Sequence, residues 1–109
     1  MESFIQVEST CPNEEEAAKL AQEILTARLG ACVHISPIQS RYHWQGEIAS
    51  DQESKLTIKT RAALYPKLEA LILVLHSYDV PQIIATEITG INPTYAAWLE
   101  EETTQTKES

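Results

Sequence analysis

Alternating apolar and polar residues at the start of the chain predict a strand over residues 4–9, with one face buried. The next segment changes to apolar residues three and four positions apart, which is the spacing of an amphipathic helix. Its predicted N-cap is Asn13, and Glu16 follows three residues later as in a capping box. Arg28 in the last turn and Gly30 just beyond it are expected to end this helix. The predicted buried stripe is Ala17, Leu20, Ala21, Ile24 and Leu25.

Two long strands joined by a tight turn are predicted for the middle of the chain. The first runs over residues 31–44 and is expected to be interrupted or bent at Pro37. Gln45-Gly46 supplies a turn, and the chain returns in a strand whose clearest part is the strict alternation over residues 55–60. Strands average about 5–6 residues, so these two are long for a chain of this size.

The last third of the chain predicts two further helices with a strand between them. The first opens near Pro66, where a proline is tolerated in the first turn. A strand is expected over residues 82–88 and a short helix over residues 92–102. The polar residues 103–109 are expected to be a frayed tail. The buried stripe predicted for the longer helix is Leu64, Leu68, Leu71, Ile72 and Leu75.

The order β-α-β-β-α-β with a C-terminal helix is that of the split βαβ, ferredoxin-like fold, an α+β class with an antiparallel sheet. We expect one domain over residues 1–102. Both long helices would lie on one face of the sheet and leave the other face uncovered. That face and the projecting hairpin favour self-association around a closed symmetry axis. The alternative is a monomer whose outer face is simply polar.

Composition narrows the function classes. The 109 residues include 8 Lys plus Arg against 16 Asp plus Glu, a net charge of −8, so a nucleic-acid partner is not expected. There is no signal-peptide pattern and no apolar run near the ~20 residues of a membrane span, which predicts a cytoplasmic protein without a membrane partner. The two cysteines, Cys11 and Cys32, fit a reducing compartment, and the topology places them at opposite ends of the sheet. No intrachain disulfide is therefore expected.

Metal ligation is the first chemical candidate. Cys11, His76 and Asp79 are expected at one end of the sheet, where they would offer mixed sulfur, nitrogen and oxygen ligands suited to copper or zinc. Cys32 and His34 lie two residues apart on one strand face and form a second, weaker pair. No dense ligand spacing supports either site. The alternative is that the cysteines are packing residues and His76 caps a helix end, so no cofactor is obligatory.

Catalysis and ligand binding are the other candidates. The sequence has no GxSxG, P-loop or GxGxxG pattern, and an enzyme is not expected. Trp44, His76 and Tyr78 would make a small-ligand pocket if they line a cleft between subunits, although aromatic residues are also favoured in interface cores. Lys59 at a strand end can hold an anion or simply keep the edge soluble.

Five segments in order give the chain a resemblance to the CutA divalent-cation tolerance family. They are LGACV at 29–33, SRYHWQG at 40–46, LTIKT at 56–60, HSYDVP at 76–81 and YAAW at 95–98. The resemblance implies a homotrimer of ferredoxin-like subunits similar to the PII signalling trimers. It also implies a non-enzymatic role in the response to metal ions, with binding of divalent cations such as copper. The alternative that it implies is a PII-like sensor that binds a small metabolite in clefts between subunits.

The resemblance carries over individual residues as well. It makes Cys32 and His76 the first candidates for metal ligation, ahead of Cys11 and Asp79. The candidate inter-subunit cleft that it implies is lined by Trp44, Lys59, His76 and Tyr78.

Two positions depart from the family pattern. Gln82 stands where the family usually has a glutamate, which weakens the negative charge available to a cation. Gly30 replaces the usual alanine, and we interpret it as a better helix terminator without functional effect.

Overall fold

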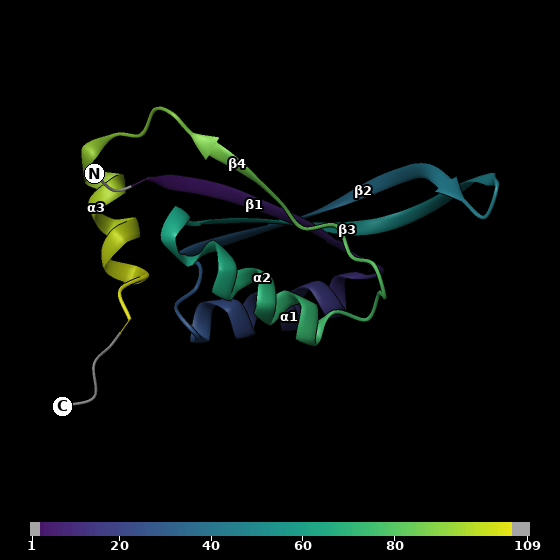
Figure 1. Ribbon diagram of the computed structural model, residues 1–109, viewed down its shortest axis with the longest axis horizontal. Coiled ribbons are helices and arrows are strands. Elements are labelled where there is room, and N and C mark those ends of the chain that lie inside the picture. Colours follow the sequence, from purple (N-terminus) through teal and green to yellow (C-terminus); the bar gives the residue numbers. More distant parts are fainter. Residues whose placement is uncertain (1–2, 106–109) are drawn as a thin grey trace.

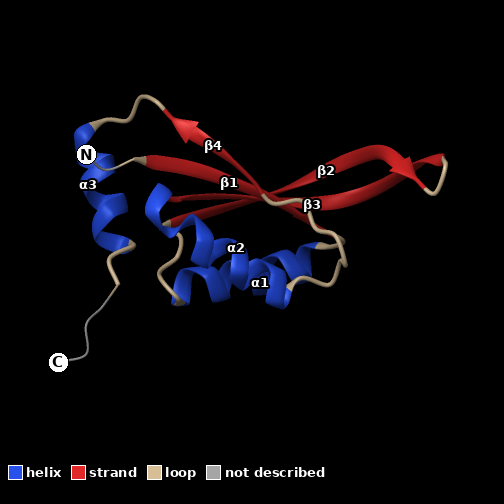
Figure 2. Ribbon diagram, viewed as in Figure 1, coloured by secondary structure: helices blue, strands red, loops and turns tan. Residues whose placement is uncertain are grey.

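The computed structural model describes residues 3–105. Its strands and helices follow one another in the predicted order (Figure 1 and Figure 2). The elements are β1 (Phe4–Cys11), α1 (Glu14–Thr26), β2 (Cys32–Trp44), β3 (Glu47–Arg61), a 3-10 turn (Ala62–Leu64), α2 (Tyr65–Leu75), β4 (Ile84–Ile88) and α3 (Pro93–Glu102).

The four strands form one antiparallel sheet in the order β2-β3-β1-β4, which confirms the ferredoxin-like α+β fold. Both α1 and α2 cover the same face, while α3 lies beyond the end of the sheet (Figure 1). The hairpin of β2 and β3 projects away from the helices and stretches the molecule to 50 × 32 × 20 Å. No helix in residues 3–105 combines the length and hydropathy that a bilayer crossing requires.

The core lies between the sheet and the two long helices. Val7 of β1, Leu56 and Ile58 of β3 and Ile72 of α2 are completely buried there. These strand residues have the period-2 spacing that the sequence predicted. On α2, however, Leu75 is 43% exposed, because the helix ends at this residue and the chain turns away from the sheet.

The start of α1 confirms half of the predicted capping box. The amide of Glu16 donates to Oδ1 of Asn13 at 2.8 Å, as expected for an N-cap. The reciprocal half would need the Glu16 side chain to accept from the Asn13 amide. Instead, both carboxylate oxygens of Glu16 accept from Ser77, in the loop after α2. The side chain therefore links α1 to the loop after α2 rather than closing its own cap.

The end of α1 corrects the role predicted for Gly30. The helix ends at Thr26, and Arg28 takes the left-handed conformation (φ 59°) that turns the chain. A Cβ on Gly30 would lie 2.7 Å from Cγ2 of Ile58 and 2.9 Å from Cγ2 of Ile24. Gly30 is thus a close-packing position between α1 and β3 and not the helix terminator.

Three predicted boundaries also need correction. β2 is not interrupted at Pro37, which pairs with Ser54 in a continuous register, because an edge strand tolerates the missing amide on its open side. β4 begins at Ile84, so Gln82 belongs to the preceding loop. The tail does not fray at Thr103, which is buried and accepts hydrogen bonds from Arg61 at its hydroxyl (2.9 Å) and carbonyl (2.7 Å) oxygens. Residues 106–109 lie outside the described residues.

Candidate functional site

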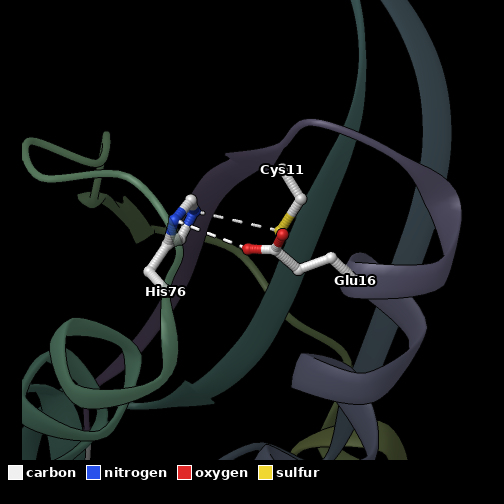
Figure 3. A group of neighbouring side chains, drawn as sticks. All are labelled: Cys11, Glu16 and His76. Atoms are coloured by element: carbon white, nitrogen blue, oxygen red, sulfur yellow. Dashed lines mark hydrogen bonds and ion pairs between the residues drawn. The ribbon is translucent and has the colours of Figure 1, made fainter.

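The end of β1 carries a cluster of sulfur, nitrogen and oxygen side-chain atoms. Cys11 is the last residue of β1, Glu16 lies in the first turn of α1, and His76 directly follows α2. Their ligand atoms all lie within 4.8 Å of one another. The three side chains point toward one another from three different elements (Figure 3). The structure therefore brings together Cys11 and His76, two of the predicted ligands, and adds Glu16, which sequence reasoning assigned only to a helix cap.

Both ring nitrogens of His76 already have partners inside the protein. Nε2 lies 2.7 Å from the carbonyl oxygen of Thr10, and Nδ1 accepts the amide hydrogen of Tyr78 at 3.0 Å. This pattern assigns the proton to Nε2, since a carbonyl can only accept and an amide can only donate. The side chain is fully buried. A metal ion at His76 would have to displace one of these bonds.

Cys11 and Glu16 are also poorly prepared to bind a cation. Burial of the Cys11 thiol, with a smaller contribution from the nearby carboxylates of Glu16 and Glu53, raises its pKa to about 11. The thiol therefore stays protonated near neutral pH, whereas metals bind the thiolate. Glu16 accepts from the hydroxyl of Ser77 at 2.8 Å and from its amide at 3.1 Å. As built, the cluster fastens β1, α1 and the loop after α2 to one another.

A second sulfur–nitrogen pair lies at the opposite end of the sheet. Sγ of Cys32 is 3.5 Å from Nε2 of His34, and Nζ of Lys59 is 3.4 Å from the other ring nitrogen. Cys32 is half-buried and His34 is exposed. Burial, with a smaller contribution from the neighbouring Cys32, raises the pKa of Tyr95, so this phenol of α3 lies beside the thiol. Unlike Cys11, this thiol faces outward beside an imidazole that solvent can reach.

The two predicted metal residues of the family resemblance, Cys32 and His76, are not brought together within one chain. His76 lies beside Cys11. Cys11 pairs with Ser54 and Cys32 pairs with Lys59, so the two cysteines are separated by five residues along β3. That is roughly 17 Å at ~3.3 Å per residue. Both cysteines are free.

A third feature is a cavity of about 820 Å³ between the hairpin and the loop after α2. It unites Trp44 and Tyr78, two of the residues predicted for a cleft, but Lys59 lies at the other end of the sheet. His76 is not in the lining but packs against Tyr78 in a tilted arrangement, with ring centroids 4.9 Å apart. Asp79 lines this cavity and is absent from the Cys11 cluster.

The cavity holds hydroxyl–carboxylate pairs that sequence reasoning did not identify. Glu53 accepts from the hydroxyl of Tyr78 at 2.7 Å and from that of Ser40 at 2.6 Å, and Tyr42 donates to Asp51. Burial and the Glu53 carboxylate raise the pKa of Tyr78, so its phenol remains a donor. Counting outward from the two-residue turn would have placed both acids on the Tyr42 face of the hairpin.

Comparison with known proteins decides the family. The family described as CutA1 divalent ion tolerance protein matches residues 5–102. The chain belongs to the CutA1 family. Among solved CutA1 structures, that of Oryza sativa superposes with a TM-score of 0.92 at 41% identity, covering 95% of this chain and 96% of that one. CutA1 from Pyrococcus horikoshii gives 0.89 at 38% identity, covering 92% and 98%.

The curated relatives of this CutA1 chain come from bacteria, archaea, plants and animals. The divalent-cation tolerance protein CutA of Thermus thermophilus is 44% identical over 86% of this chain and 92% of its own length. The chloroplastic CutA of Arabidopsis thaliana is 45% identical over 86% of this chain. Only 52% of the Arabidopsis protein is covered, so the chain spans about half the length of that relative.

Proposed function

We propose that this CutA1 chain acts in divalent-cation tolerance by binding divalent cations such as copper or zinc, without enzymatic activity. The names of the Thermus thermophilus and Pyrococcus horikoshii relatives support the general role. The net charge of −8 would draw cations toward the surface but would not select among them. The two free cysteines support a reducing compartment, and we propose the cytoplasm.

The observation that carries the cation proposal is the contact between Cys32 and His34. A thiolate with an imidazole is a ligand pair that suits copper and zinc, and the 3.5 Å between Sγ and Nε2 lets one ion bridge them after a small adjustment. Residues two apart on a strand project from the same face. The neighbouring Lys59 contributes no ligand, so the remaining coordination positions would be taken by water or by a second subunit.

The cluster of Cys11, Glu16 and His76 is the competing metal site. We assign it a structural role because all three side chains are already engaged or, for Cys11, protonated. We do not propose Asp79 as a ligand of either site, because it lines the cavity at the hairpin. The two assignments make opposite predictions for substitutions at the two cysteines.

Isothermal titration of the purified protein with Zn²⁺ and Cu²⁺ distinguishes a metal site at Cys32 from one at Cys11. We expect Cys32→Ser and His34→Ala each to weaken binding at least tenfold, while Cys11→Ala and His76→Ala leave it unchanged. Ca²⁺ serves as the control for loose attraction by the negative surface, since it prefers oxygen ligands. Zn²⁺ binding that survives Cys32→Ser and is lost in Cys11→Ala would overturn the site. If Ca²⁺ binds as tightly as Zn²⁺ and Cu²⁺, and none of the four substitutions changes the affinity for any of these ions, then cation binding is non-specific and the function proposal fails.

We further propose that the working unit is a homotrimer. One face of the sheet has no helix over it, and the hairpin exposes Ile48 (69%) at its far end. An uncovered sheet face and an exposed aliphatic side chain on a projecting arm favour burial against a second copy. Light scattering should give a mass near three times the chain's 12.2 kDa. A mass near that of one chain would contradict the trimer.

A PII-like sensor of a small metabolite is the second candidate function. It is favoured by the cavity at the hairpin, whose volume of about 820 Å³ lies within the range of small-molecule sites, ~300–1,000 Å³. A thermal-shift screen of charged and neutral metabolites tests it. A ligand that raises the melting temperature, with metals inert, would favour the sensor. A screen in which only metals act would contradict it.

A further inference from the structure

We infer that the cavity between the hairpin and the loop after α2 binds an organic cation, a small molecule with an ammonium or guanidinium group on an apolar body. This deepens the sensor proposal by naming the chemical class of its ligand. Two properties of the lining lead to it: three aromatic rings gather there, and the charged groups beside them are mostly carboxylates.

The rings come from two segments that are distant in the sequence. Tyr42 and Trp44 lie two residues apart on one face of β2, and Tyr78 reaches the cavity from the loop after α2. The hydroxyl of Tyr78 is fixed by Glu53, and its ring packs against His76, so this wall of the cavity is held in place. An organic cation over the face of Trp or Tyr is attracted by the ring quadrupole.

Within one chain, the cavity lining carries more negative than positive side chains. Asp51, Glu53 and Asp79 line the cavity, with Arg41 as the one basic residue among its described lining. None of the ion pairs between described residues involves these three acids. Asp51 and Glu53 are hydrogen-bonded by hydroxyl groups, which hold a carboxylate in place without neutralising it. A ligand cation would supply the missing counter-charge.

The same lining argues against an anionic ligand and against a bare metal ion as the natural occupant. An anion would meet three carboxylates. A divalent ion such as Mg²⁺ would be satisfied by carboxylates and water and would leave the three rings without a role. A cation with an apolar body uses both features at once, and the cavity has room for it.

The fluorescence of Trp44 provides a direct test. The chain has two tryptophans, and Trp98 lies in α3 beyond the other end of the sheet, so the full chain carrying Trp98→Phe has a single reporter at the cavity. The probes are choline, its uncharged carbon analogue 3,3-dimethylbutan-1-ol, and Mg²⁺ and Zn²⁺ alone. We expect choline to change the Trp44 emission saturably, and the uncharged analogue to bind at least tenfold more weakly.

Variants locate the charge. Glu53→Gln should weaken choline binding about tenfold, which corresponds to ~1.4 kcal/mol. Asp51→Asn tests the same point at an exposed position, in case Glu53→Gln disturbs the hairpin. Glu100→Gln makes the same charge change on the exposed surface of α3 and should leave the affinity unchanged.

Three results would overturn the inference: equal binding of choline and its uncharged analogue, equal effects of Glu53→Gln and Glu100→Gln, or a saturable Trp44 response to the metal ions that Glu53→Gln abolishes. The last result would make the cavity a metal site. The thermal-shift screen could also identify a neutral or anionic metabolite that changes the Trp44 emission. That result would support the sensor function but refute a cationic ligand. The Zn²⁺ titration at Cys32 does not depend on either result.

Discussion

His76 donates a 2.7 Å hydrogen bond from Nε2 to the carbonyl oxygen of Thr10, which fixes the loop after α2 to the end of β1. Its other nitrogen accepts the amide hydrogen of Tyr78, so one buried ring satisfies a backbone carbonyl 66 residues upstream and a backbone amide two residues downstream. Buried backbone groups that lose such partners are costly. Both nitrogens of the His76 ring are therefore engaged in hydrogen bonds that stabilise the fold, and neither is free to bind a ligand.

Replacing His76 by alanine should destabilise the protein without affecting metal affinity. The substitution removes the partners of the Thr10 carbonyl and the Tyr78 amide, together with the ring that packs against Tyr78. We expect a loss of about 2–4 kcal/mol in the free energy of unfolding, measured by urea denaturation. His43→Ala, on the exposed hairpin, is the matched control and should change little. Equal effects of the two substitutions would refute the structural role of His76.

The two cysteines should differ sharply in reactivity. Cys11 is completely buried, and its pKa is raised to about 11, whereas Cys32 is partly accessible. Because only an accessible thiolate is alkylated, iodoacetamide at pH 8 should label Cys32 alone in the folded protein. Peptide mass spectrometry reads the labelled sites, and labelling in urea should add Cys11. Labelling of Cys11 in the native state at a rate near that of Cys32 would contradict the buried position.

The raised pKa of Cys11 also predicts the direction of a pH effect on stability. The folded protein holds the thiol proton more tightly than the unfolded chain, whose thiol has the ordinary pKa of 9.0. The resulting stabilisation is complete below pH 9 and is lost as the pH rises to about 11. Urea denaturation across this window should show a steeper loss in the native protein than in Cys11→Ala. Parallel curves would show that burial of this thiol does not shift its titration.

Gly30 and Gly90 provide a matched pair for the packing of α1 on β3. A methyl group at Gly30 would come within 3.0 Å of Ile24 and Ile58, whereas nothing lies within 4 Å of the same position at Gly90. Gly30→Ala should therefore cost about 1–3 kcal/mol of stability. Gly90→Ala should be neutral or slightly stabilising, since alanine restricts the unfolded chain. Thermal denaturation of both variants decides this, and equal melting temperatures would contradict the close packing at Gly30.

Patterns within one element were enough to predict the fold. Alternation identified β1 and β3, and Asn13 with its acidic first turn marked the start of α1. Partners distant in the sequence could not be predicted in this way. The capping-box pattern accounts for Glu16 locally, but Ser77, 61 residues away, competes successfully for the same carboxylate. Thr103 looked like part of a polar tail because its partner, Arg61, lies 42 residues upstream.

The same limit applies to the candidate site. Sequence reasoning placed Cys11 and His76 at one end of the sheet and Cys32 at the other, which the strand register confirms. It did not show that His76 has both nitrogens engaged, because those bonds involve backbone atoms whose positions depend on the whole fold. The cavity acids Asp51 and Glu53 are charges on an alternating strand, a pattern that usually indicates a solvated face.

Absorption spectroscopy with Co²⁺ tests the proposed cation site most directly. Co²⁺ occupies sites of the kind that bind zinc, and a Co²⁺–thiolate bond gives a charge-transfer band in the near ultraviolet. We expect this band in the native protein and in Cys11→Ala, its loss in Cys32→Ser, and a weaker band in His34→Ala. A band that persists in Cys32→Ser and disappears in Cys11→Ala would place the metal in the buried cluster at the end of β1 and contradict the account.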